Sequence, residues 1–95
     1  MVSFLVRLKF ASEDRAEMAQ MVIDLAAESR KEPGCVTYVP HHVQDDPDTI
    51  LIYEQYRDSQ ALDAHRASAH FKKYAVGGLY QKMKERQIEN LSALV

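Results

Sequence analysis

The sequence predicts an α+β protein with a ferredoxin-like fold, in which the elements follow one another as β-α-β-β-α-β. Three observations predict it. Residues 2–10 alternate between two sides with the period of a β-strand, whereas residues 12–31 carry apolar side chains at helical spacing. Two further strand patterns, joined by an acidic turn, then precede a second helical region and a last apolar alternation. This order places the helices on one face of an antiparallel sheet.

The first strand and the first helix show the clearest periodicity. One side of the strand carries Phe4, Val6, Leu8 and Phe10, and the other carries Ser3, Leu5, Arg7 and Lys9. The apolar stripe of the helix comprises Ala19, Val22, Leu25, Ala26 and Ser29. Ser12 is a candidate N-cap, and Pro33-Gly34 ends the helix. We therefore expect a helix over about residues 12–31.

A β-hairpin is expected next. The segment Cys35–Val43 is rich in β-branched and aromatic side chains, and Pro40 within it favours an edge position or a bulge. The segment Asp45-Asp46-Pro47-Asp48 has the composition of a turn. Residues 50–56 then supply the partner strand, so that a short loop joins two neighbouring antiparallel strands.

Two helices and a last strand complete the predicted order. Asp58 or Ser59 caps a helix that runs to about Arg66, and Ser68 caps another that reaches toward Lys84. A weak point within this last helix is the pair Gly77-Gly78. The final strand is indicated by the apolar residues Ile88, Leu91, Ala93 and Val95.

The composition predicts a single domain over residues 1–95 and argues against several function classes. The chain is 27% charged with a net charge of −2, and it lacks the dense basic face of a nucleic-acid-binding protein. One cysteine, Cys35, excludes an intramolecular disulfide and suits a reducing compartment. The first residues are too charged for a signal peptide, and no apolar run reaches the ~20 residues of a membrane-spanning helix. We expect a cytoplasmic protein that binds neither nucleic acid nor membranes.

The second face of the predicted sheet has no helix to cover it. The apolar side chains expected on this face are Leu5, Val39, Val43, Leu51 and Tyr53. A sizeable exposed apolar patch usually marks an interface. A chain of this length also buries only roughly 60–65% of the surface that its unfolded form exposes. We therefore expect a homodimer in which two sheets pack face to face.

Metal and nucleotide cofactors lack a sequence signature. Adjacent strand residues such as His41 and His42 point to opposite faces and cannot share an ion. On one helix, His65 and His70 would lie about 140° apart, which is a poor arrangement for joint ligation. The chain contains no Gly-rich phosphate loop. Cys35 is typical of a small strand hydrophobe rather than a nucleophile. We expect no metal and no cofactor.

Two histidines are the strongest candidates for acid–base chemistry. His65 shares a helical stripe with Ala61 and Leu62, so its ring is expected against the core, where an imidazole can take or give a proton near neutral pH. His70 precedes Phe71 near the start of the following helix. The alternative interpretation is structural: His65 holds a helix junction, and His70 is a partly exposed residue at a helix start.

An acidic residue and several phenols accompany these histidines. Strand alternation places Glu54 on the same face as Ile50 and Ile52, and a buried carboxylate needs hydrogen bonds or a cationic partner. Glu54 is therefore either a functional group or a structural anchor. The phenols that can orient a polar ligand or pack in the core are those of Tyr38, Tyr53, Tyr56, Tyr74 and Tyr80.

Three motifs together resemble the antibiotic biosynthesis monooxygenase family. They are Glu32-Pro33-Gly34-Cys35-x-x-Tyr38, Ile52-Tyr53-Glu54-x-Tyr56-x-Asp58 and Ala61-Leu62-x-x-His65-x-x-Ser68-x-His70-Phe71. The chain looks most similar to the small bacterial quinol monooxygenases and to the autoinducer-degrading enzyme. The resemblance implies a dimeric α+β barrel, with a pocket between sheet and helices, and oxygenation that often needs neither metal nor flavin. The haem-degrading relatives carry a Trp where this chain has His65 and a ligating His near Ala75, which argues against haem degradation here.

The resemblance and the residues together suggest a cofactor-independent monooxygenase. It would act with dioxygen on a small quinol, polyphenol or enolisable molecule. The expected catalytic residues are His65 as base, His70 and Tyr74 as orienting groups and Glu54 as a polarising group; the expected substrate-binding residues are Tyr38, Tyr56 and Phe71. Two alternatives stay open: a proton-shuttling isomerase, and a non-catalytic ligand-binding or assembly dimer. The enzymatic interpretation requires a sheltered His65 ring beside a hollow.

Overall fold

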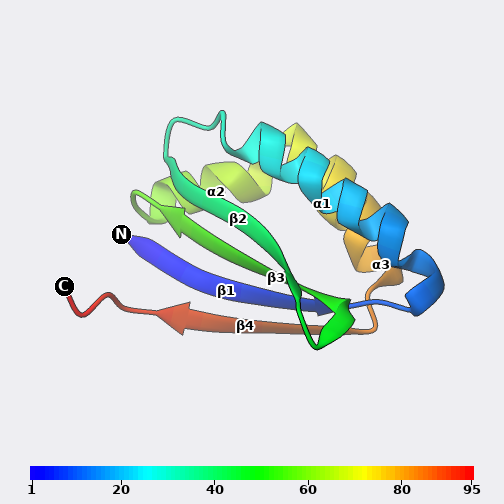
Figure 1. Ribbon diagram of the computed structural model, residues 1–95. Coiled ribbons are helices and arrows are strands. Elements are labelled where there is room, and N and C mark those ends of the chain that lie inside the picture. Colours follow the sequence, from blue (N-terminus) through cyan, green and yellow to red (C-terminus); the bar gives the residue numbers. More distant parts are fainter.

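A four-stranded antiparallel sheet carries all the helices on one of its faces (Figure 1). The structure is a computed structural model that describes residues 1–95. The elements are β1 (Val2–Lys9), η1 (Ser12–Asp14), α1 (Arg15–Ser29), β2 (Cys35–Val43), β3 (Asp46–Tyr56), α2 (Ser59–Ala67), η2 (Phe71–Leu79), α3 (Tyr80–Lys82) and β4 (Glu85–Leu91). The predicted ferredoxin-like order is confirmed. None of the helices combines the length and the hydrophobicity that a membrane crossing requires.

The sheet has the strand order β2-β3-β1-β4, so β1 is central and β2 forms one edge. Val6 of β1 pairs with Ile52 of β3 on one side and with Ile88 of β4 on the other. The edge position predicted from Pro40 is confirmed. The buried core on the helical face includes the predicted strand residues Phe4, Val6, Leu8, Phe10, Ile50 and Ile52. Period-two alternation therefore identified the buried face of the two inner strands.

The opposite face of the sheet carries no helix (Figure 1). The apolar residues predicted there are half-buried or exposed; they are Leu5, Val39, Val43, Leu51 and Tyr53. Leu51 lies directly opposite Arg7 of β1 and His41 of β2, in the middle of this face. The sheet therefore presents a mixed surface with an apolar centre.

Helix α1 packs on the sheet through most of the predicted stripe, with Val22, Leu25, Ala26 and Ser29 buried. At the start of the stripe Met18 is buried, whereas the predicted Ala19 is only half-buried. The helix begins with a 3-10 turn, and the predicted Ser12 cap is wrong. The Ser12 hydroxyl donates to Asp48 Oδ2 across 2.8 Å and makes no cap hydrogen bond. Because Asp48 also accepts from Arg15, this carboxylate ties the start of α1 to the β2–β3 hairpin.

The hairpin is longer than the sequence suggested. The turn comprises only residues 44–45, and β3 starts at Asp46 rather than at Ile50. Asp46 pairs with Val43 after a register shift, and its carboxylate accepts from the Thr49 hydroxyl at 2.6 Å. A bulged strand end tolerates Pro47 and the neighbouring acids, so turn composition alone misplaced the boundary.

The last helical segment runs without a break through Gly77-Gly78, contrary to the predicted weak point, and ends at Lys82. Its central part is a π-helix, in which the Tyr80 amide donates to the Ala75 carbonyl. A Cβ at Gly78 would collide with Met21 Sδ of α1. Gly78 therefore allows two helices to approach closely.

The final strand, β4, spans Glu85–Leu91, several residues earlier than predicted. It pairs with β1 up to Ser3, opposite Leu91. Only Val2 of β1 lies beyond this pair, and Ala93 and Val95 lie outside the strand, contrary to the prediction.

Replacing Leu25 by alanine tests the core on α1. Leu25 is 2% exposed, so Leu25→Ala should lower the free energy of unfolding by about 2–5 kcal/mol, because it leaves a cavity. Ile23 on the same helix is 54% exposed, and Ile23→Ala should change stability by less than about 0.5 kcal/mol. Urea unfolding of both variants provides the measurement; equal losses would contradict this packing.

Candidate functional site

His65 lies at the centre of the space between helix α2 and the sheet. The Asp58 carboxylate accepts from the Ala61 amide at 2.8 Å, which confirms the predicted cap and starts α2 at Ser59. Two turns later the helix buries His65, whose ring is 2% exposed. The sheltered position that the enzymatic interpretation requires is therefore present.

The chain changes direction directly after α2. Ser68 has an extended backbone, its hydroxyl donates to the His65 carbonyl at 2.6 Å, and the same oxygen accepts from the Phe71 amide at 3.2 Å. Ser68 thus ends one helix and begins the next. Because of this break, His70 does not continue the course of α2 but faces His65, with the two ring centroids 6.1 Å apart.

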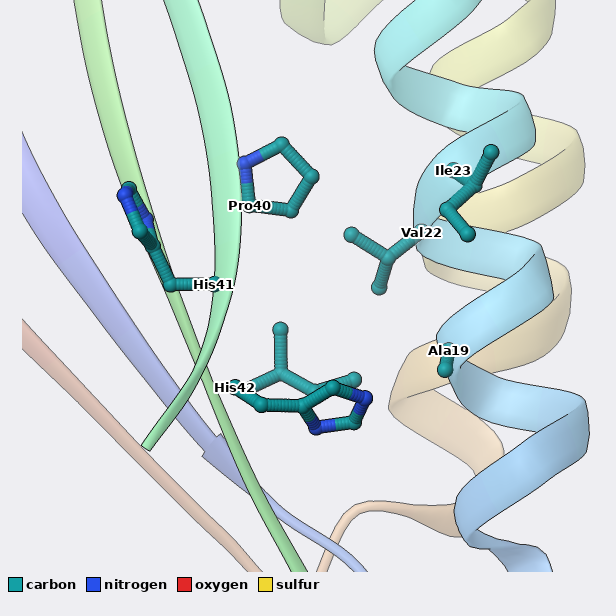
Figure 2. A pocket seen from close by; sticks show the side chains of 7 residues that line it. Ala19, Val22, Ile23, Pro40, His41 and His42 are labelled. Atoms are coloured by element: carbon teal, nitrogen blue, oxygen red, sulfur yellow. The ribbon is translucent and has the colours of Figure 1, made fainter. Parts of the chain in front are cut away.

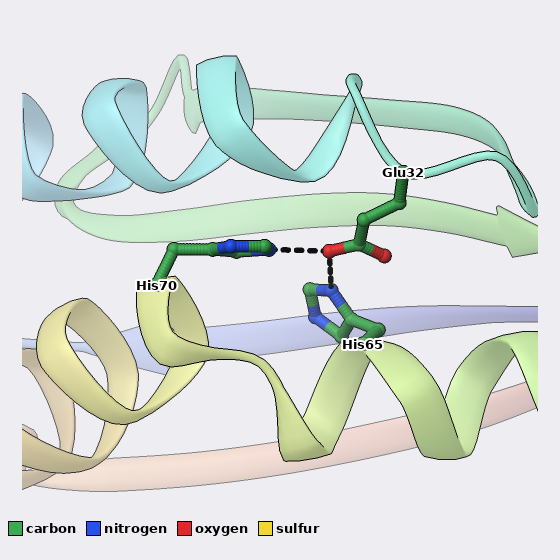
Figure 3. A group of neighbouring side chains, drawn as sticks. All are labelled: Glu32, His65 and His70. Carbon is green, nitrogen blue, oxygen red and sulfur yellow. Dashed lines mark hydrogen bonds and ion pairs between the residues drawn. The ribbon is translucent and has the colours of Figure 1, made fainter.

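A glutamate joins the two imidazoles. Glu32 Oε2 accepts from His65 Nδ1 at 2.8 Å and from His70 Nε2 at 2.5 Å (Figure 3). The prediction that Ser68 caps a second helix is confirmed. The spacing of about 140° on one helix is wrong for this pair, because His65 and His70 lie on opposite sides of that break. An ionised carboxylate only accepts, so each of these ring nitrogens carries the donated hydrogen.

Glu32 lies on the tight loop between α1 and β2. The Glu32 amide donates to the Ser29 carbonyl, and the Glu32 carbonyl accepts from the Cys35 amide. The Gly34 carbonyl accepts from the Arg57 amide at 2.9 Å. Sequence reasoning did not identify Glu32 as a site residue. Its only signal was its place at the head of the motif Glu32-Pro33-Gly34-Cys35.

A second carboxylate faces the other nitrogen of His65. Glu54 Oε1 lies 3.8 Å from His65 Nε2 and accepts from the Tyr56 hydroxyl at 2.7 Å. Glu54 is 5% exposed, as strand alternation predicted. Burial raises the pKa of Glu54 to about 7, partly offset by the Tyr56 hydrogen bond. Burial also lowers the pKa of His65, against the opposing effect of Glu32, so the interior favours the uncharged form of both groups.

Aromatic rings surround the His65 imidazole. Tyr56 and Phe71 each lie 5.1 Å from its centroid, and Tyr38 lies 5.9 Å away. Burial raises the pKa values of Tyr38 and Tyr56 above their ordinary range, so both phenols stay protonated. The structure thus brings the three predicted substrate-binding residues together around the predicted base.

Two small hollows adjoin His65, each of about 30 Å³. The residues that line both are Val6, Glu54, His65, Phe71 and Tyr80. One hollow lies between α2 and β4, where Arg66 and Arg86 also line it. A space of this size holds about one water molecule. A larger ligand therefore requires side chains at its mouth to move.

Other candidates lie apart from this group. Tyr74 is half-buried with the Lys73 ammonium 5.0 Å from its ring centroid, and it neither joins these hydrogen bonds nor lines the hollows. Cys35 is partly buried, and burial raises the pKa of its thiol, which fits a packed hydrophobe rather than a nucleophile.

A separate groove of about 120 Å³ lies between α1 and the edge strand β2 (Figure 2). Its walls include Val22, Ile23, Pro40 and His42. Figure 2 shows the His42 ring directed toward α1 and the His41 ring on the other side of β2, as strand alternation predicted. Because the two rings point to opposite sides of β2, they are not placed to bind one ion together.

The three residues of the carboxylate-bridged group are also the ones that could hold a metal ion. Ligand atoms of Glu32, His65 and His70 all lie within 4.8 Å of one another. They come from the α1–β2 loop, from α2 and from the residue before η2. The arrangement therefore offers two chemistries, proton transfer at His65 and coordination of a cation.

Comparison with known proteins identifies the family. A sequence model described as antibiotic biosynthesis monooxygenase matches residues 1–76. The chain belongs to the antibiotic biosynthesis monooxygenase family. The resemblance seen in the three motifs is thereby confirmed, while no curated protein matches the chain.

Solved structures of similar proteins share the fold. A Pseudomonas aeruginosa protein is 26% identical, with 99% of this chain and 94% of that chain covered and a TM-score of 0.91. A Bacteroides thetaiotaomicron protein of unknown function, described as a possible oxidoreductase, is 27% identical, with 95% and 94% covered and a TM-score of 0.88. An antibiotic biosynthesis monooxygenase that is 22% identical covers all of both chains with a TM-score of 0.92, which shows the fold alone.

Gly34 controls the position of Glu32 and offers a sharp test of this site. A Cβ at Gly34 would overlap with the Cβ of Ala61 on α2. Gly34→Ala should therefore lower the free energy of unfolding by about 1–3 kcal/mol, because the loop is pushed away from α2.

The matched control is Ala61→Gly, which removes the colliding methyl group and costs about 1 kcal/mol as a helical glycine. The double variant should lose less free energy of unfolding than the two single variants lose together, because the overlap is absent from it. Urea unfolding of all four proteins completes the cycle. Additive losses would show that Gly34 and Ala61 are not in contact.

Proposed function

We propose that this protein is a cofactor-independent monooxygenase that deprotonates a small quinol, polyphenol or enolisable molecule and lets the resulting anion react with dioxygen. The observation that carries the proposal is the environment of the two ring nitrogens of His65. Its Nδ1 hydrogen is held by Glu32 at 2.8 Å, which leaves Nε2 as the free nitrogen, buried beside a hollow. Family membership supports oxygen chemistry in general and leaves substrate and mechanism to experiment.

The contacts of His65 suit a general base. A carboxylate that accepts from Nδ1 fixes the ring orientation and tautomer, and it stabilises the imidazolium that forms when Nε2 takes a proton. Glu32 supplies this carboxylate. Glu54, held by the Tyr56 hydroxyl, lies on the Nε2 side and can polarise or orient the reacting group. His70 shares the Glu32 oxygen and connects the group to the surface, since its side chain is 20% exposed.

The reaction balances without an external reductant. Proton loss gives an electron-rich anion, which passes one electron to dioxygen; the substrate radical and superoxide then combine to a peroxide at carbon. The peroxide takes a proton back from His65 and loses water. For a hydroquinone the sum is quinol plus O₂ giving hydroxyquinone plus water. One oxygen atom enters the substrate, the other leaves as water, and the substrate supplies all four electrons.

The surroundings favour an anionic intermediate that is shielded from water. Arg66 and Arg86 line the hollow between α2 and β4, and their positive charge attracts a phenolate or enolate. The hollow of about 30 Å³ accepts dioxygen more readily than an aromatic ring. Entry of the organic substrate therefore requires Phe71 or Arg86 to change rotamer. Tyr74 stays a predicted orienting group that lies outside this space.

Replacing the base is the direct test. His65→Gln should lower turnover by about 10²–10⁴-fold, because the glutamine can still contact Glu32 but cannot take a proton. The matched control is His42→Gln, which alters an exposed histidine in the separate groove and should leave turnover unchanged. Oxygen consumption across a panel of hydroquinones and flavonoid-like polyphenols measures the effect, with thermal melting to show that each variant is folded.

The second candidate function is a non-catalytic ligand-binding or assembly protein. It is favoured by one observation: Glu32, His65 and His70 connect three segments in a nearly closed interior. In that case the wild-type protein consumes no oxygen with any compound of the panel, and His65→Gln changes only the melting temperature. If the wild-type protein turns over a substrate and the His65→Gln variant does so at the same rate, the proposed base is also contradicted.

We further propose that the protein forms a homodimer through the helix-free face of the sheet. This face has an apolar centre that includes Leu51 and the partly exposed Val39. The catalytic group lies on the other, helical face. The dimer would therefore stabilise the sheet that carries Glu54 without covering the hollow beside His65.

A charge in the middle of that face tests the dimer. Leu51→Glu should convert the dimer into monomers, because it places unpaired carboxylates in the interface. Ile23→Glu is the matched control, since Ile23 is exposed on α1 in the helical layer. Sedimentation equilibrium measures the mass of each protein. A monomeric wild-type protein, or a dimer that survives Leu51→Glu, would contradict the proposal.

A further inference from the structure

We propose that Glu32, His65 and His70 form a binding site for a divalent transition-metal ion, for which zinc is the best-suited probe, and that metal at this site and base catalysis by His65 exclude each other. The first part stands on the geometry of the three side chains alone. The second part rests on the function proposed above.

The donor set is the first argument. Two imidazole nitrogens and one carboxylate are a common ligand set for zinc and for other divalent transition metals. The three ligand atoms lie within 4.8 Å of one another and converge from three segments of the chain (Figure 3). At metal–ligand distances of 2.0–2.2 Å, ligands around a tetrahedral ion lie about 3.3 Å apart. The present N–O distances of 2.8 and 2.5 Å therefore need to widen by less than about 1 Å.

An oxygen without a partner is the second argument. Glu32 Oε1 is buried and makes no hydrogen bond, although its sister oxygen accepts two. A buried carboxylate oxygen without a partner is unfavourable, and a cation bound by both oxygens of Glu32 would remove that cost.

The surroundings of His65 supply the third argument. A histidine that ligates a metal through one nitrogen usually donates its other ring hydrogen to a carboxylate, which orients the ring. Glu54 Oε1 lies 3.8 Å from His65 Nε2 and is itself held by the Tyr56 hydroxyl at 2.7 Å. An arrangement of carboxylate, histidine and ion is thus already outlined. Arg66 and Arg86 line the hollow on the Nε2 side and oppose a cation there, so the ion belongs on the Nδ1 side.

The same geometry makes metal and catalysis exclusive. A neutral imidazole bound to an ion through Nδ1 carries its hydrogen on Nε2. That nitrogen can then donate to Glu54 but can no longer take a proton from a substrate. Binding of the ion also consumes the Glu32 oxygen that would otherwise stabilise the imidazolium. A divalent ion is therefore expected to switch the proposed base off.

Metal titration of the chelator-treated protein tests the site. Calorimetry with zinc should give one ion per chain, and cobalt should give the visible bands of a low-coordinate site with nitrogen and oxygen ligands. Glu32→Gln and His70→Ala should each weaken zinc binding at least about 10-fold. The matched control is a variant with both His41 and His42 changed to alanine, which removes the exposed histidines and should bind zinc like the wild type.

The outcomes separate the two parts of the proposal. Absence of stoichiometric binding overturns the site, and so does binding that survives Glu32→Gln and His70→Ala or that disappears in the His41/His42 variant. Zinc that binds at this site and abolishes oxygen consumption supports both parts. Zinc that binds there while turnover continues contradicts the exclusion. Stoichiometric binding by a protein that turns over no substrate upholds the site and contradicts the proposed function alone.

Discussion

The site depends on one carboxylate oxygen that serves two imidazoles. Glu32 Oε2 accepts from His65 Nδ1 and His70 Nε2 and thereby joins the α1–β2 loop to both helices that follow β3. The side chain of Glu32 is 15% exposed, so its charge is only partly hydrated and needs these donors. Removal of either histidine would leave the largely buried carboxylate of Glu32 with only one of its two hydrogen-bond donors. The same bonds that hold the helix junction therefore also set the tautomer of His65.

The fold brings these groups together through two local features. Gly34 lets the loop lie directly against Ala61, so that Glu32 reaches over the end of α2. Ser68 interrupts the helix through hydrogen bonds of its hydroxyl to the His65 carbonyl and the Phe71 amide, and this turn directs His70 back toward His65. Neither feature is a catalytic group. Each fixes the direction of a backbone segment, and the side chains follow.

Periodicity predicted the parts of the site that lie on regular elements. Alternation along residues 50–56 placed Glu54 in the core, and helical spacing placed His65 there; both are buried. The order of strand and helix patterns predicted the fold, which the sheet order confirms, and the three motifs predicted the family. Glu32 escaped prediction because a loop residue has no period, and its partners lie 33 and 38 positions away in the sequence. The break at Ser68 was itself predicted, but the pairing of His65 with His70 escaped because the angular spacing of one helix does not apply across such a break, and the sequence does not give the angle between the two helices.

The two imidazoles share a hydrogen-bond acceptor, but their environments differ. The His65 side chain is 2% exposed and its free nitrogen faces Glu54, whereas the His70 side chain is 20% exposed. Burial lowers the pKa of His65, so its ring is neutral and ready to accept a proton at neutral pH. A proton taken up at Nε2 is stabilised by Glu32 on the far side of the ring, and His70 on that same oxygen adjoins solvent. Under the proposed function, proton transfer is therefore assigned to the buried imidazole of His65, and proton exchange with water to the partly exposed imidazole of His70.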